Sequence, residues 1–327
     1  MNEIRFIHLN RNRWEEFENL VKKGSNVSPD RLSDLYIGLT NDLAYARTYY
    51  SGSNTTQYLN FLAQKAHQII YQNKPVRKGR IVAFWRYDFP LAIYAVRKEI
   101  LVSFLVFTLS VLIGILSNRY DKDFVRVILG DQYVDMTLAN IEKGDPMAVY
   151  KQMNEIDMFL GISLNNIYVS FLAFLFGIFT ALGSGFILLK NGIMLGTFQG
   201  FLAQKGYLYE SLATVWIHGT LEIFAIIVAG GAGIVMGNSF IFPGTYSRLK
   251  SFQDAARKGL KIIIGLVPVF VVAGFLEGFV TRHTDFPYGI RFLIIGFSIL
   301  LILFYFVIYP YQLKLKYTDY GKRNNQL

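Results

Sequence analysis

The stretch Ile100–Ser117, ILVSFLVFTLSVLIGILS, contains no charged residue and is long enough to form one membrane-spanning helix. A hydrocarbon core of about 30 Å needs roughly 20 apolar residues in a helix. Further apolar runs follow, so the sequence predicts an all-α fold: a polytopic membrane helix bundle of about six spans with an N-terminal cytoplasmic helical domain. The predicted spans are Ile100–Ser117, Asn166–Leu189, Gly192–Gln204, Leu212–Met236, Ile262–Thr281 and Ile290–Tyr309.

The run Gly192–Gln204 is the weakest of the six, because it is short and rich in glycine. Two structures fit it: a short but complete span, or a re-entrant half-helix. Re-entrant backbone is tolerated in a membrane where protein or water covers it.

The basic residues alternate with the apolar runs and predict the orientation. Lys and Arg outnumber Asp and Glu by 15 to 8 in residues 1–98, by 5 to 1 in 245–261 and by 4 to 1 in 311–327. In residues 118–162 the ratio is 5 to 8. Positive segments remain on the cytoplasmic side. We therefore expect a cytoplasmic helical domain (1–98), a membrane bundle (99–310) with an extracytoplasmic loop (118–162), and a basic cytoplasmic tail (311–327).

Composition excludes several classes of protein. The chain has no cysteine, which rules out disulfides, cysteine zinc fingers and thiol nucleophiles. The net charge of +10 is spread between apolar runs, so it does not indicate a nucleic-acid partner. The N-terminal segment MNEIRFIHLNRNRWEEF has no apolar core, and no cleaved export signal is expected.

The first 98 residues predict three helices. The triplet Ser28-Pro29-Asp30 combines a capping serine, a proline at the first helical position and an acid in the first turn. The run Ser51–Asn54 ends that helix and precedes another that reaches about Gln72. An earlier helix is predicted over about Arg13–Lys22.

Two acidic residues, Glu222 and Glu277, fall well inside apolar spans. Such groups are costly in a membrane and usually face a partner or a cavity. His218 precedes Glu222 by four residues and shares its helix face. Asn165 and Asn166 open the second predicted span from the same side. We therefore expect these five residues to converge in the outer half of the bundle.

Three interpretations of this cluster stay open. It could be a hydrogen-bonded knot that fixes helix packing, a cavity for transport or binding, or a metal or acid–base site. His218, Glu222 and Glu277 offer ligands that zinc accepts. However, their spacing is not the H-E-x-x-H signature. No cofactor is expected, and zinc is the alternative.

Seven short motifs together resemble the stage II sporulation protein M family over most of the chain. They are R-x-x-W-E-E-F at Arg11–Phe17, L-x-x-D-L-A-Y-A-R at Leu39–Arg47, A-H-x-x-I-Y at Ala66–Tyr71, N-N-I-Y-V-S-F at Asn165–Phe171, K-N-G-I-M-L-G at Lys190–Gly196, H-G-T-L-E at His218–Glu222 and L-E-G-F-V-T at Leu276–Thr281.

The resemblance implies a multi-pass protein of the bacterial cytoplasmic (inner) membrane, and the charge pattern predicts that both termini lie in the cytoplasm. It implies a scaffold or assembly factor linked to cell-envelope or peptidoglycan processes, rather than an enzyme. Its expected partners are membrane lipids and other membrane or cytoplasmic proteins, with no nucleic acid, and an oligomer is compatible with it. The alternatives are a small-solute or lipid transporter or channel, and an intramembrane metal-dependent hydrolase.

Overall fold

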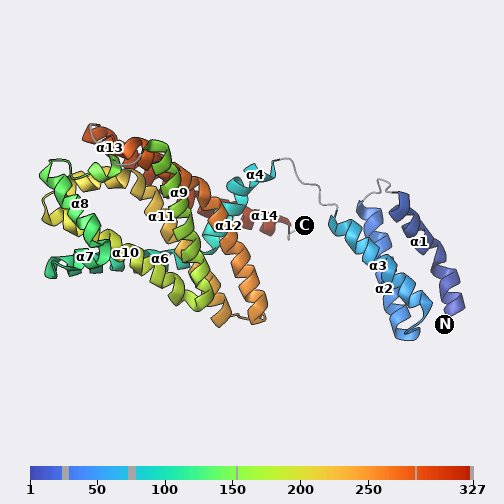
Figure 1. The fold of residues 1–327 in the computed structure, drawn as a ribbon. Helices are drawn as coiled ribbons and strands as arrows, with labels where there is room; N and C mark the ends of the chain where they lie inside the picture. The colour runs from blue at the N-terminus through green and yellow to red at the C-terminus, as the bar shows by residue number, and fades with distance from the viewer. Residues whose placement is uncertain (24–28, 73–78, 152–153, 284–285, 325–327) are drawn as a thin grey trace. The chain divides into compact units, whose positions relative to one another are not determined.

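The computed structural model describes residues 1–23, 29–72, 79–151, 154–283 and 286–324. These residues form helices and their connections, and none of them lies in a strand, as predicted for an all-α chain. The chain divides into two compact units, Met1–Arg80 and Ile81–Leu327. Figure 1 shows the helices of both units.

The first unit contains three helices: α1 (Glu3–Lys23), α2 (Pro29–Tyr49) and α3 (Asn54–Gln72). The predicted helices after Pro29 and up to Gln72 and the break before Asn54 are confirmed, whereas Ser28 and the residues that follow Gln72 lie outside the described residues. The predicted first helix was too short, because α1 begins ten residues earlier, at Glu3. Its added turns are anchored by Phe6, which packs against the rings of Trp14 and Tyr45.

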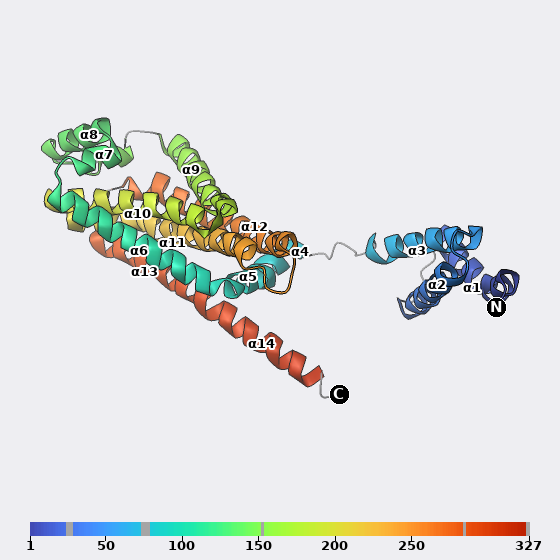
Figure 2. The ribbon, with the colours of Figure 1, turned by 90° about the horizontal axis from the view of Figure 1, so that it is seen from below.

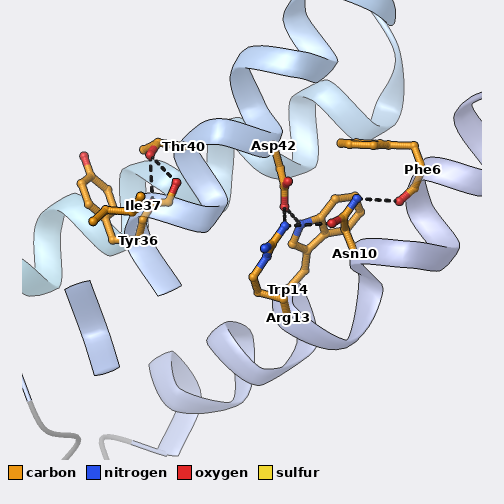
Figure 3. A network of polar contacts seen from close by, with 8 residues as sticks. All are labelled: Phe6, Asn10, Arg13, Trp14, Tyr36, Ile37, Thr40 and Asp42. Carbon is orange, nitrogen blue, oxygen red and sulfur yellow. Dashed lines mark hydrogen bonds and ion pairs between the residues drawn. The ribbon is translucent and has the colours of Figure 1, made fainter. Parts of the chain in front are cut away.

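A polar contact is embedded in the apolar core of this unit (Figure 3). The Asp42 carboxylate on α2 accepts a hydrogen bond of 2.8 Å from the Trp14 indole and one of 2.5 Å from the Arg13 guanidinium, both on α1. Trp14 and Asp42 are 3% and 8% exposed. This contact fixes the register of α1 against α2, because buried donors need a partner.

The second unit is a helical bundle (Figure 2). Its elements are α4 (Arg80–Ala83), the π-helix η1 (Phe84–Asp88), α5 (Phe89–Ala95), α6 (Arg97–Tyr120), α7 (Phe124–Leu129), α8 (Asp131–Glu142), the 3-10 helix η2 (Ala148–Lys151), α9 (Glu155–Leu175), the 3-10 helix η3 (Phe176–Phe179), α10 (Thr180–Gln204), α11 (Leu208–Ile241), α12 (Arg248–Phe275), the π-helix η4 (Leu276–Thr281), α13 (Tyr288–Ile302), the π-helix η5 (Leu303–Ile308) and α14 (Tyr309–Asn324).

Five stretches of the described chain are long and apolar enough to cross a membrane. One of them, Glu155–Gln204, is not a single rod. It consists of α9 and α10 joined by η3, and at that junction Thr180 has a φ of 70°. The chain reverses there (Figure 2), which divides this stretch into two helices, so the described chain offers six candidate crossings, in α6, α9, α10, α11, α12 and α13–α14.

The predicted bounds of two spans were therefore wrong. The run predicted as one helix, Asn166–Leu189, contains the end of α9, the reversal and the start of α10. The weak segment Gly192–Gln204 is the second half of the 25-residue helix α10, which is long enough for a complete crossing, and it is not a separate half-helix. Lys190, expected at the cytoplasmic boundary, is exposed ten residues into α10. Hydropathy missed the reversal because apolar residues continue through it.

Helix α11 lies at the centre of the bundle. In its apolar window 78% of the residues are buried, compared with 22% for α6. It packs against α6, α9, α10, α12 and α13. Glycines let neighbouring helix backbones approach each other closely. For example, a Cβ at Gly196 of α10 would lie 2.1 Å from the Val111 carbonyl oxygen of α6. Small residues let membrane helices pack closely where lipid supplies no hydrophobic drive.

The two ends of the bundle differ. One end, here called the loop end, carries α7, α8 and η2. The other, here called the turn end, carries the reversal before Thr180 and the connection from α11 to α12. Gly237 near the end of α11 packs on Thr180, which places both connections together. On the charge pattern we expect the loop end to be extracytoplasmic.

Candidate functional site

The five residues of the predicted cluster line one cavity of about 510 Å³ in the membrane unit. Asn165 and Asn166 come from α9, His218 and Glu222 from α11, and Glu277 from η4. Further lining comes from α6 and α10, and from α7, α8 and η2 of the loop end. The cluster therefore borders open space, and its polar side chains do not pack only against one another.

Local helix geometry brings the three ionisable side chains together. On α11 the four-residue spacing stacks His218 and Glu222 on one face. Glu277 lies where α12 widens into the π-helix η4, which runs to Thr281. π-Helical turns within helices occur frequently at functional sites.

The histidine has a defined environment on both sides of its ring. Nδ1 of His218 lies 3.0 Å from Oγ1 of Thr281. Nε2 lies 3.5 Å from Oε2 of Glu277. One ligand atom each from His218, Glu222 and Glu277 lies within 4.8 Å of the other two. Their side chains could therefore bind one cation together.

The two asparagines lie beside this triad. Asn166 is 5% exposed and accepts a 3.3 Å hydrogen bond from Asn165. Its amide approaches the Glu222 carboxyl. Nevertheless, its Nδ2 atom has no partner with hydrogen-bond geometry among the described residues. A buried donor without a partner costs about 1–3 kcal/mol, so Asn166 offers a hydrogen bond to a ligand in the cavity.

Two tyrosines from the loop end cover the triad. The ring of Tyr150 lies 5.8 Å from that of His218, and Tyr133 also lines the cavity. Burial, and then the negative charge of Glu277, raise the pKa of Tyr133 to about 12. The same two effects raise the pKa of Tyr150 well above 10. Both phenols therefore remain protonated at neutral pH and can donate hydrogen bonds.

The cavity has apolar walls and an exposed flank. Its walls include Phe107 of α6, Phe198 of α10 and Ile226 of α11. Asn165 on α9 and Met194 on α10 are exposed although they line it. A ligand can therefore reach the polar triad between these two helices or beneath the loop end.

The cavity ends before the turn end. Beyond Ile226, residues 227–229 and 232 of α11 are at most 4% exposed and belong to the main apolar core. That core also contains Phe174, Leu188 and Phe270 from three other helices. In the described chain the lining thus stops in the middle of the bundle, which makes the cavity a blind pocket.

Sequence reasoning missed three residues of the site, Tyr133, Tyr150 and Thr281. The two tyrosines belong to a loop that was interpreted only through its charge. Thr281 was noted only as part of a motif and as the end of a span. The pairing of Thr281 with His218 depends on the helical phase of η4, which hydropathy does not reveal.

Each of the two units matches a known protein family. The model of the family described as Stage II sporulation protein M matches residues 103–282, which include every residue of the predicted cluster. A domain family of unknown function, DUF8413, matches residues 4–72. An uncharacterized protein of Methanocaldococcus jannaschii, MJ0706, is 25% identical over 190 residues, which cover 57% of this chain and 82% of that protein. No solved structure matches the chain.

Proposed function

Because the chain belongs to the stage II sporulation protein M family and is a multi-pass membrane protein, we propose that its membrane unit binds a small polar ligand from the extracytoplasmic side. The observation that supports this proposal is the 510 Å³ cavity lined by all five residues of the polar cluster. A cluster that only fixed packing would not need to border such a space, because close-packed interiors hold few voids larger than a water molecule.

The chemistry of the lining residues restricts the class of ligand that the cavity can bind. Two carboxyl groups, an imidazole and asparagine oxygens make the inner part of the cavity rich in acceptors. A cation, or a molecule with several N–H or O–H donors, satisfies them better than an anion does. Apolar walls such as Phe107 and Ile226 also accommodate the hydrocarbon part of an amphiphile.

The blind end favours binding over conduction. A channel needs a continuous path, whereas the core around Phe174, Leu188 and Phe270 fills the turn end. A transporter would have to rearrange that core, in which glycines hold helix backbones in contact. We therefore favour a binding protein over a transporter as the function of the membrane unit.

A single-cysteine experiment tests the proposal, because the natural chain contains no cysteine. Gly219 lines the cavity, and a Cβ there would meet only side-chain atoms at 3.6 and 3.8 Å. We expect a membrane-impermeant maleimide to label Gly219→Cys in intact cells. Ala229→Cys, at a position that is 0% exposed, is the matched control in α11 and should stay unlabelled.

Lys122→Cys in the loop after α6 provides the positive control for the outer face. If Gly219→Cys reacts no faster than Ala229→Cys while Lys122→Cys is labelled, the cavity is not open to water from outside. If it reacts only after the cells are permeabilised, the cavity faces the cytoplasm. Either result removes the proposal.

The separate N-terminal unit favours a second candidate function, a scaffold that recruits cytoplasmic proteins. Met1–Arg80 has its own core and its own family match. This candidate predicts that deletion of residues 1–80 abolishes specific crosslinks in cells while Gly219→Cys labelling persists. Unchanged crosslinks after the deletion would argue against the scaffold.

A further inference from the structure

We propose that the cavity binds one divalent transition-metal ion, with Nε2 of His218 and one carboxylate oxygen each of Glu222 and Glu277 as its ligands. The inference rests on the proposed function, because it names the ligand class of the same cavity. It adds a metal site made of three residues from two crossings and identifies the atoms that bind the ion.

The histidine is already oriented as a metal ligand requires. A metal-bound histidine usually hydrogen-bonds through its other ring nitrogen, which fixes the tautomer and the ring plane. Thr281 Oγ1 lies 3.0 Å from Nδ1 and provides that contact. Nε2 is therefore left for a ligand, and it lies 3.5 Å from Oε2 of Glu277.

The distances suit an ion better than a direct contact. Zinc–nitrogen and zinc–oxygen distances of about 2.0–2.2 Å place neighbouring tetrahedral ligand atoms about 3.3–3.6 Å apart. His218 Nε2 and Glu277 Oε2 are 3.5 Å apart. That separation is long for a hydrogen bond. All the separations within the triad are at most 4.8 Å.

The burial of two carboxylates also points to a cation. Glu277 has a side chain that is 12% exposed, and Glu222 lies near it. Two carboxylates this close repel each other in a poorly solvated site, unless one of them holds a proton or a cation lies between them, and a cation at this point would relieve the repulsion with both groups ionised. Arg282, the nearest basic residue along the chain, pairs instead with Glu155 at 3.4 Å.

Asn166 provides a second, independent indication of a ligand. Asn166 lines the cavity, and its buried Nδ2 atom has no partner with hydrogen-bond geometry in the part of the chain that the structure describes, although the amide approaches Glu222. An amide N–H cannot bind a metal, but it can donate to a water molecule or an anion in the fourth coordination position. Three protein ligands with an open fourth position are typical of reactive zinc sites.

Metal analysis of the full chain tests the proposal. The protein is purified in detergent with a tag that contains no histidine, stripped with a chelator, loaded with Zn²⁺ and desalted. We expect one zinc ion per chain, and with Co²⁺ the ligand-field absorption of a four-coordinate N/O site. Glu222→Gln and Glu277→Gln should each weaken zinc binding at least tenfold, because the amide keeps the shape and removes the charge.

His283→Gln is the matched control, since it removes another histidine that follows η4 but does not line the cavity. It should bind zinc as the wild type does. Absence of stoichiometric zinc in the folded wild type overturns the metal site, as does wild-type affinity in Glu277→Gln. If either glutamine variant fails to fold, the cobalt spectrum of the wild type still decides.

The two proposals can fail separately. If Gly219→Cys is labelled but the protein binds no zinc, the proposed function stands and the metal site is refuted. A cavity closed to the maleimide removes the function that the metal site presupposes.

Discussion

Replacing Asp42 with alanine should strongly destabilise the N-terminal unit. The Asp42 carboxylate is the acceptor for the buried Trp14 indole at 2.8 Å and for Arg13 at 2.5 Å (Figure 3). Alanine removes both hydrogen bonds and leaves the Trp14 N–H in an apolar core. Asparagine keeps an oxygen acceptor at the same place but removes the charge.

The magnitude follows from the burial of each partner. An unsatisfied buried donor such as the Trp14 N–H costs about 1–3 kcal/mol. The Arg13 side chain is 39% exposed, so its ion pair adds at most about 1 kcal/mol. Asp42→Ala should therefore lower the free energy of unfolding by about 1–4 kcal/mol, and Asp42→Asn by at most about 1 kcal/mol, since only the charge is lost.

Urea unfolding of the Met1–Arg80 unit measures this difference. Trp14 is the only tryptophan in that unit, so its fluorescence reports the transition without interference. With a urea slope of about 1 kcal/mol per molar, the alanine variant should unfold at a urea concentration lower by roughly 1 M or more. A shift below about 0.5 M, or equal effects of alanine and asparagine, would refute the assignment of Asp42 as the buried acceptor.

Three further predictions concern pH, helix packing and topology. Burial and the hydrogen bond to Glu18 raise the pKa of Tyr58 to about 12. The folded unit therefore keeps this proton more tightly than the unfolded chain. The stability that Tyr58 adds is complete below pH 10 and is lost between about pH 10 and 12. The difference in unfolding free energy between wild type and Tyr58→Phe should shrink over that range, and a constant difference would contradict this. Gly196→Ala should destabilise the bundle by about 1–3 kcal/mol, because its Cβ meets the Val111 carbonyl. Gly185→Ala in the same helix meets nothing within 4 Å and should leave the thermal midpoint in detergent unchanged or higher; equal midpoints for the two variants would exclude the α6–α10 contact. Ile178→Cys in the reversal between α9 and α10 should react with an impermeant maleimide only from the cytoplasmic side, and labelling in intact cells would invert the predicted orientation.

The helical class and the residues of the polar cluster could be predicted from the sequence. Both depend on the free-energy cost of placing polar groups in a membrane, which the distribution of apolar and charged residues along the chain makes visible. A charged residue within an apolar run is expensive wherever the run packs, so Glu222 and Glu277 are conspicuous from the order of residues alone. The four-residue spacing of His218 and Glu222 likewise follows from helix geometry.

The bounds of the second and third spans could not be predicted in the same way. Apolar residues continue from α9 through Phe176–Phe179 into α10, so hydropathy does not fall at the reversal. The turn depends on Thr180, whose φ of 70° no propensity predicts. Tyr133 and Tyr150 reach the cavity only because the loop end folds over the bundle, a long-range contact invisible in local patterns.

The central claim is that the polar cluster forms a ligand site that holds a metal ion. An experimentally determined structure of the zinc-loaded protein in lipid, with anomalous scattering measured at the zinc edge, tests it most directly. We expect one anomalous peak about 2.0–2.2 Å from His218 Nε2 and from one carboxylate oxygen each of Glu222 and Glu277, at the inner end of a water-filled cavity. A dry cluster whose side chains hydrogen-bond only to one another, with no peak, would contradict it.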